Sequence, residues 1–85
     1  MTYDLEYSVE AVMQLEKLDK QIAKRILKKL ETTIDDPHNF FSQLTGRPEY
    51  KLRAGDYRVI ADIGDKNKKI FVRTLGHRKN IYDKT

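Results

Sequence analysis

The strongest constraint on the fold is a pair of strand-like segments, residues 57–63 and 70–75, separated by a segment in which residues 64–68 have turn chemistry. Such a pair is typical of an antiparallel β-hairpin, which Gly76 is expected to end. In the first segment apolar and polar residues alternate, so strand geometry directs them to opposite faces. The apolar set is Tyr57, Val59, Ala61 and Ile63. We therefore predict that Arg58 and Asp62 point away from the core.

The N-terminal half is predicted to form a short strand and two helices. Residues 3–7 alternate apolar with polar side chains, which favours a strand with one buried face. Ser8 and Asp19 can cap two successive helices, because their side-chain oxygens accept hydrogen bonds from first-turn amides. Across residues 22–34 apolar side chains recur at spacings of three and four, which predicts the longer helix. That helix should end before Pro37.

The segment between the helices and the hairpin, residues 37–48, is predicted to be a loop. Residues 50–53 form a short candidate strand before the hairpin, and a final short strand is possible around Ile81. The loop's apolar side chains are expected to turn inward: Phe40, Phe41 and Leu44.

The order of elements favours an α+β fold: an N-terminal strand, a helical hairpin, then an antiparallel sheet of three to four strands. A chain of 85 residues suits a single domain, residues 1–85. If the helices cover one face of the sheet, the other face is exposed and carries Arg58.

Charge is unevenly distributed along the chain. Residues 1–46 carry six Lys or Arg and eight Asp or Glu, a net charge of −2, whereas residues 47–85 carry eleven and five, a net charge of +6. Such asymmetry points to a polyanion bound by the C-terminal half. The alternative is a solvated basic surface.

Several classes of protein are excluded. The chain has no cysteine, so it forms no disulfide, thiolate zinc site or cysteine nucleophile. No phosphate-binding loop, dinucleotide fingerprint or zinc-protease motif is present, and two histidines are too few for a metal cluster. The N-terminus lacks the basic and apolar regions of a signal peptide, and no apolar run could cross a bilayer. We expect a soluble, cytoplasmic protein with no membrane association, metal or cofactor.

Basic residues concentrate in the C-terminal half, with Tyr50, Tyr57, His77 and Tyr82 among them, a composition suited to nucleic acid. Arginine binds phosphate oxygens with paired hydrogen bonds, while tyrosine or histidine can stack on a base or transfer a proton. RNA supplies its own nucleophile, the 2′-hydroxyl, so cleavage needs only alignment, charge stabilisation and proton transfer. The same residues would also serve a passive nucleic-acid binder.

The segment YKLRAGDYRVIADIGDKNKKIFVRTLGHRKNIY, residues 50–82, resembles the RelE/ParE toxin superfamily. The resemblance lies in LxxGDYRVI, a polar hairpin turn, an apolar strand and GHRxxIY, with LTGRPEY just before them. It covers residues 44–82. The resemblance implies a RelE-like, microbial ribonuclease-type fold and a toxin of a type II toxin–antitoxin system.

The resemblance to RelE-like members implies a ribosome-dependent mRNA endoribonuclease, or mRNA interferase, that inhibits translation. Such an enzyme cuts mRNA in the A site of the ribosome without a metal, through attack by the 2′-hydroxyl. The implied partners are the ribosome, mRNA and a RelB-like antitoxin in a heteromeric toxin–antitoxin complex. Two alternatives remain: a ParE-like, non-enzymatic inhibitor of DNA gyrase, and an inactive member or general nucleic-acid binder.

The resemblance also implies catalytic residues. Arg58 in GDYR and Arg78 in GHRK match two arginines that stabilise the scissile phosphate, and Tyr82 in IYDK matches a tyrosine that stacks on the substrate or exchanges protons. Lys51 in YKLR matches a lysine close to the phosphate. Glu49 departs from the pattern, because RelE-like members carry a second lysine there.

Further residues are expected to contact RNA: Arg47, Arg53, His77 and Lys79. Arg53 or His77 could compensate for the missing lysine, since histidine suits proton transfer near neutral pH. The structural alternatives are that Arg58 pairs with a neighbouring aspartate, either Asp56 or Asp62, and that Tyr82 covers the edge of the sheet.

Overall fold

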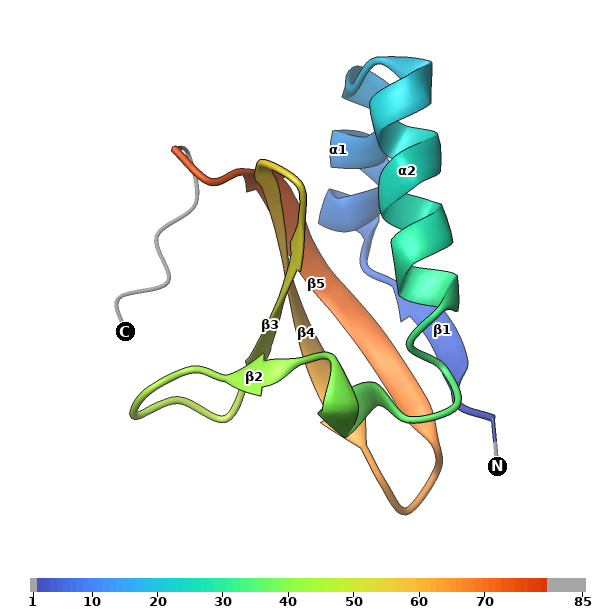
Figure 1. The fold of residues 1–85 in the computed structure, drawn as a ribbon, viewed down its shortest axis with the longest axis vertical. Coiled ribbons are helices and arrows are strands. Elements are labelled where there is room, and N and C mark those ends of the chain that lie inside the picture. Colours follow the sequence, from blue (N-terminus) through green and yellow to red (C-terminus); the bar gives the residue numbers. More distant parts are fainter. Residues whose placement is uncertain (1, 80–85) are drawn as a thin grey trace.

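The computed structural model describes residues 2–79, which form a five-stranded sheet with two helices on one face (Figure 1). The strands lie in the order β1-β5-β4-β3-β2. The predicted α+β class is confirmed, as is the order of strand, helical hairpin and further strands. The strand bounds are Asp4–Tyr7 for β1, Ser42–Gln43 for β2, Tyr50–Ala54 for β3, Tyr57–Gly64 for β4 and Lys69–His77 for β5.

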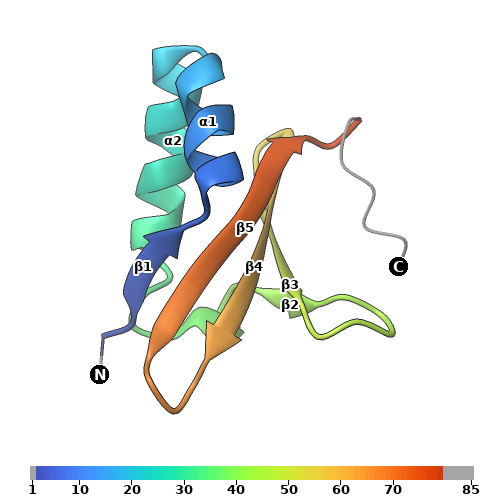
Figure 2. The same cartoon turned by 180° about the vertical axis from the view of Figure 1, so that it is seen from behind.

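The sheet is antiparallel from β2 to β5, but β1 runs parallel to β5. Two helices, α1 (Val9–Lys17) and α2 (Lys20–Glu31), connect β1 to the rest of the chain. They cover one face of the sheet, and Figure 2 shows β1 beside β5 at its edge. The antiparallel prediction therefore holds for four strands, and the helical connection lets β1 join as a parallel fifth.

Both predicted helix caps are present. The Ser8 hydroxyl accepts a hydrogen bond from an amide of α1 at 3.0 Å, and the Asp19 carboxylate accepts one from α2 at 2.9 Å. These bonds satisfy first-turn amides that have no partner within the helix. α2 ends at Glu31, so Ile34 lies in the turn that follows and the helix stops before Pro37 as predicted.

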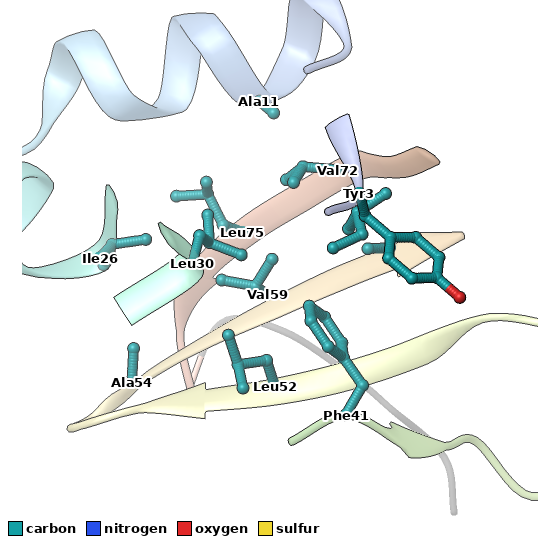
Figure 3. Packing of buried hydrophobic residues seen from close by; sticks show 12 residues of the cluster. Tyr3, Ala11, Ile26, Leu30, Phe41, Leu52, Ala54, Val59, Val72 and Leu75 are labelled. Atoms are coloured by element: carbon teal, nitrogen blue, oxygen red, sulfur yellow. The ribbon is translucent and has the colours of Figure 1, made fainter. Parts of the chain in front are cut away.

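The core lies between the helices and the sheet (Figure 3). Ile26 and Leu30 of α2 are almost fully buried against side chains of β3, β4 and β5. Burial of these apolar side chains is the main force that holds the helices on the sheet. The buried side chains from the three strands are Leu52, Ala54, Val59, Ala61, Ile70, Val72 and Leu75.

The predicted loop at residues 37–48 contains a 3-10 helix, η1 (Pro37–Asn39), and the two-residue strand β2. A strand this short has too few residues to show a periodic pattern. Phe41 and Leu44 are buried as predicted, but Phe40 is 41% exposed. Phe40 caps the C-terminus of η1, whereas Phe41 lies in the segment that leads to β2 and packs on the core. The inward prediction for Phe40 is therefore wrong.

The prediction that Gly76 ends the last strand is also wrong, because β5 continues to His77. Gly76 pairs with Arg58 and His77 pairs with Tyr57, so the ladder with β4 extends through the glycine. A glycine can join such a ladder because its backbone donates and accepts like any other residue's. The strand predicted around Ile81 lies outside the described residues.

Candidate nucleic-acid site

Arg53 of β3 and Arg58 of β4 are directly paired residues on the face of the sheet that lies away from the helices. Their neighbours Leu52 and Val59 belong to the core, and successive side chains of a strand point to opposite faces. On its other side Arg58 pairs with Gly76 of β5, which has no side chain. Gly76 therefore places no side chain beside Arg58 on that face.

A cleft of about 180 Å³ brings three of the predicted residues together: Lys51, Arg53 and Arg58. Lys51 lies two residues before Arg53 in β3 and therefore faces the same side of the sheet. The cleft also contains Phe40, Ser42 and Leu52. Phe40 and Ser42 were not among the predicted site residues, since both belong to a segment that reads as a loop.

Arg78 lies just beyond the end of β5. Its backbone amide donates a hydrogen bond of 2.8 Å to the carbonyl of Asp56, which extends the pairing with β4 by one residue beyond His77. This hydrogen bond holds the backbone of Arg78 beside the turn between β3 and β4, two residues after Gly76, which pairs with Arg58. Lys79 follows and is exposed. Tyr82 lies outside the described residues.

His77 is not brought together with the arginines. It pairs with Tyr57, and the two rings meet edge to face with centroids 5.3 Å apart. Together with Gln14 and Lys17 of α1, these rings border a hollow on the helix side of the sheet. The sheet itself therefore separates His77 from the cleft that contains Arg58.

A second group of charges, consisting of two ion pairs, lies close to β3, β4 and β5. Arg47 Nε is 3.1 Å from the Glu49 carboxylate, and Arg73 Nε is 2.5 Å from that of Asp62. The hydrogen bond from Arg47 is the main cause that lowers the pKa of Glu49 below its ordinary value. The hydrogen bond to Asp62 likewise raises the pKa of Arg73.

These pairs bear on two predictions. The carboxylate of Asp62 forms an ion pair with Arg73, whereas the alternative considered in the sequence paired Asp62 with Arg58. Arg47 borders a separate hollow in the loop between β2 and β3, rather than the cleft that contains Arg58.

Within residues 2–79, no three His, Asp or Glu side chains converge to form a group that could hold a metal ion. Across the same part of the chain, neither helix is both long and apolar enough to span a bilayer.

The chain matches the family described as ParE toxin of type II toxin-antitoxin system, parDE, over residues 5–82. It therefore belongs to this family, within the RelE/ParE superfamily, and is a toxin of a type II toxin–antitoxin system.

Two relatives are informative. A RelE-like toxin protein of Escherichia coli is 32% identical over 82 residues, which cover 93% of this chain and 86% of the relative. The mRNA interferase toxin RelE of Escherichia coli is 28% identical with the same coverage.

Solved structures show the same fold. The archaeal RelE–RelB complex from Pyrococcus horikoshii matches with a TM-score of 0.75 and 30% identity, over 95% of this chain and 100% of that one. The toxin–antitoxin complex RelBE2 from Mycobacterium tuberculosis matches with a TM-score of 0.85 over 92% of this chain and 100% of that one. The sequence identity is only 20%, so this match supports the fold alone.

Proposed function

We propose that this toxin is a RelE-like mRNA endoribonuclease that acts in the ribosomal A site without a metal or cofactor and so stops translation in the cytoplasm. The observation that carries the proposal is the cationic cleft of Lys51, Arg53 and Arg58, with the backbone of Arg78 held two residues beyond Gly76, the strand partner of Arg58. The name of the related mRNA interferase RelE supports the same activity. Residues 1–85 would act as one toxin domain, in keeping with a family match over residues 5–82.

The chemistry assigned to the cleft is transesterification within the RNA. The 2′-hydroxyl attacks the adjacent phosphorus, the bond from phosphorus to the 5′-oxygen breaks, and a 2′,3′-cyclic phosphate and a 5′-hydroxyl result. Arg58 and Arg78 would stabilise the negative charge that develops on the phosphate oxygens. Lys51 would lie at the same phosphate, and Tyr82 would stack on the substrate or exchange its protons. Arg53 and Lys79 would bind neighbouring phosphates.

Arg47 and His77 would play smaller parts, since one is paired with Glu49 and the other faces the helices. A RelB-like antitoxin is the proposed partner in a heteromeric complex, because related toxins are found in complexes with RelB. An acidic antitoxin segment over the cationic cleft would compete with the substrate phosphates.

Cleavage of a defined mRNA in a translating extract tests the proposal. Primer extension should map discrete cuts with the wild-type toxin, and Arg58→Ala or Arg78→Ala should slow them at least about a hundredfold. Arg73→Ala is the matched control, because it removes an arginine from β5 that is bound to Asp62 outside the cleft. Equal cutting by the wild type and the Arg58 or Arg78 variants would refute the proposal.

The ParE-like alternative, inhibition of DNA gyrase without catalysis, is favoured by one observation, the description of the matching family as ParE toxin. A supercoiling assay on the same preparations separates the two functions. Inhibited supercoiling with uncut mRNA would assign the toxin to the gyrase-inhibiting type.

A further inference from the structure

Phe40 is a large apolar side chain that is exposed at the edge of a cationic cleft. It is 41% exposed, although Phe41 beside it is buried in the core. Phe40 follows the 3-10 helix η1 as its C-terminal capping residue, and this local backbone path keeps the ring out of the core. Exposure of an aromatic ring to water is unfavourable, so a ligand that covers the ring binds with a more favourable free energy.

The surroundings of Phe40 indicate which ligand would cover it. The ring shares the cleft with Lys51, Arg53 and Arg58. The Lys29 ammonium of α2, which does not line the cleft, lies 5.7 Å from the ring centroid. A nucleotide combines a phosphate, which such cations attract, with a flat base, which stacks on aromatic rings whatever its identity. A cleft that offers cations and an aromatic ring together therefore complements both parts of one nucleotide.

We infer that Phe40 is a stacking platform for a base of the RNA substrate, next to the phosphate that Lys51 and Arg58 bind. This inference rests on the proposed function and adds a binding role for a residue outside the proposed catalytic set. Phe40 has no group that could transfer a proton, so its role is to position the nucleotide. Stacking would limit rotation of the strand and so favour alignment of the 2′-hydroxyl with the phosphorus.

Fluorescence offers a direct test, because the chain contains no tryptophan. Phe40→Trp introduces a single indole at the proposed platform, and Phe71→Trp introduces one at a control position. Phe71 of β5 is 36% exposed and pairs with Asp62 of β4, outside the cleft. A single-stranded oligoribonucleotide should quench the indole of the Phe40→Trp variant and leave that of Phe71→Trp unchanged. Equal quenching of both, or equal quenching by inorganic polyphosphate, would overturn the inference.

Affinity provides the second test. Phe40→Ala should weaken binding of the same oligoribonucleotide about tenfold, since base–aromatic stacking contributes that order of affinity. Phe40→Tyr should retain the affinity of the wild type, because a phenol ring stacks as a phenyl ring does. Phe71→Ala should leave it unchanged. The thermal midpoints of all variants should match that of the wild type, because neither ring belongs to the core cluster.

The two proposals fail in distinguishable ways. If Phe40→Ala binds and cuts RNA like the wild type while Arg58→Ala does not cut, only the stacking inference is wrong. If the wild type cuts no mRNA, the proposed nuclease function fails, and quenching confined to the Phe40→Trp variant would still establish base stacking at this cleft.

Discussion

Arg53 and Arg58 face each other as directly paired residues of adjacent strands, on the side of the sheet opposite the core and the helices. Like charges at directly opposed positions of a sheet destabilise it, by about 0.2–1 kcal/mol. The arrangement costs folding stability and concentrates positive charge, which a bound polyanion would offset.

Removal of one charge from this pair should therefore stabilise the free toxin. Within residues 2–79 no carboxylate forms an ion pair with Arg53, so Arg53→Gln removes repulsion without breaking a salt bridge. We expect its thermal midpoint to rise by about 2–4 °C at low salt, the shift that corresponds to about 0.5 kcal/mol. The gain should shrink near 1 M salt, because screening acts on exposed charges. Calorimetry that shows a lower midpoint at low salt would contradict this account.

Glu49 is a carboxylate close to the cationic face, and its removal should strengthen RNA binding. Glu49→Gln releases Arg47 from its ion pair and deletes one negative charge, which at about 10 Å from a phosphate corresponds to about a twofold tighter complex. Glu6→Gln is the control, since Glu6 lies in the edge strand β1 and forms an ion pair with Lys69. Fluorescence anisotropy with a labelled oligoribonucleotide measures both. Equal tightening by the two variants would show a general effect of net charge.

Gln14 connects α1 to β5 at an irregular point of the ladder. Its Oε1 accepts a hydrogen bond of 2.8 Å from the amide of Leu75, a buried residue close to the register shift between β4 and β5. Gln14→Leu should destabilise the fold by about 1–3 kcal/mol, because it leaves that amide without a partner. Urea unfolding measures the change. Gln21→Leu on the exposed side of α2 is the control, and a loss of equal size there would disprove a specific role for Gln14.

Asp65 joins three segments of the chain and should make stability depend on acid pH. Its Oδ1 accepts the Tyr3 hydroxyl at 2.8 Å and lies 2.7 Å from His38 Nε2. The hydrogen bond from His38, followed by that from Tyr3, lowers the pKa of Asp65 below its ordinary value of 3.8. The folded state therefore favours the carboxylate, and its contribution is present above pH 3.8 and lost as the pH falls through the lowered pKa.

Asp65→Asn removes this titration. The variant should be less stable than the wild type at pH 6, and the difference should shrink as the pH falls below 3.8. Thermal unfolding at a series of pH values provides the comparison. A difference that stays constant over this range would mean that protonation of Asp65 is not linked to folding.

Much of the fold could be predicted from local patterns. The alternation in β4, the helical spacing behind Asp19 and the caps at Ser8 and Asp19 are decided by residues close together in the chain, where periodicity and capping chemistry suffice. Alternation also predicted correctly that Arg58 lies on the face opposite the core.

Contacts between distant segments could not be predicted in this way. Three features depend on residues dozens of positions apart: the parallel pairing of β1 with β5, the continuation of β5 through Gly76, and the hydrogen bond from the Leu75 amide to Gln14. No local pattern carries that information, because the free energy of such contacts arises only when the segments meet.

For the candidate site, too, some features follow from the sequence and others only from the tertiary structure. By itself the sequence determined which residue types are available: a basic C-terminal half, arginines in GDYR and GHRK, and a lysine in YKLR. Only the tertiary structure decided that Arg53 joins Arg58 in one cleft, that His77 faces the helices, and that Phe40 is exposed beside the cations. The physical reason is that strand alternation orients a side chain relative to its own strand, whereas pairing with neighbouring strands determines which side chains share a face.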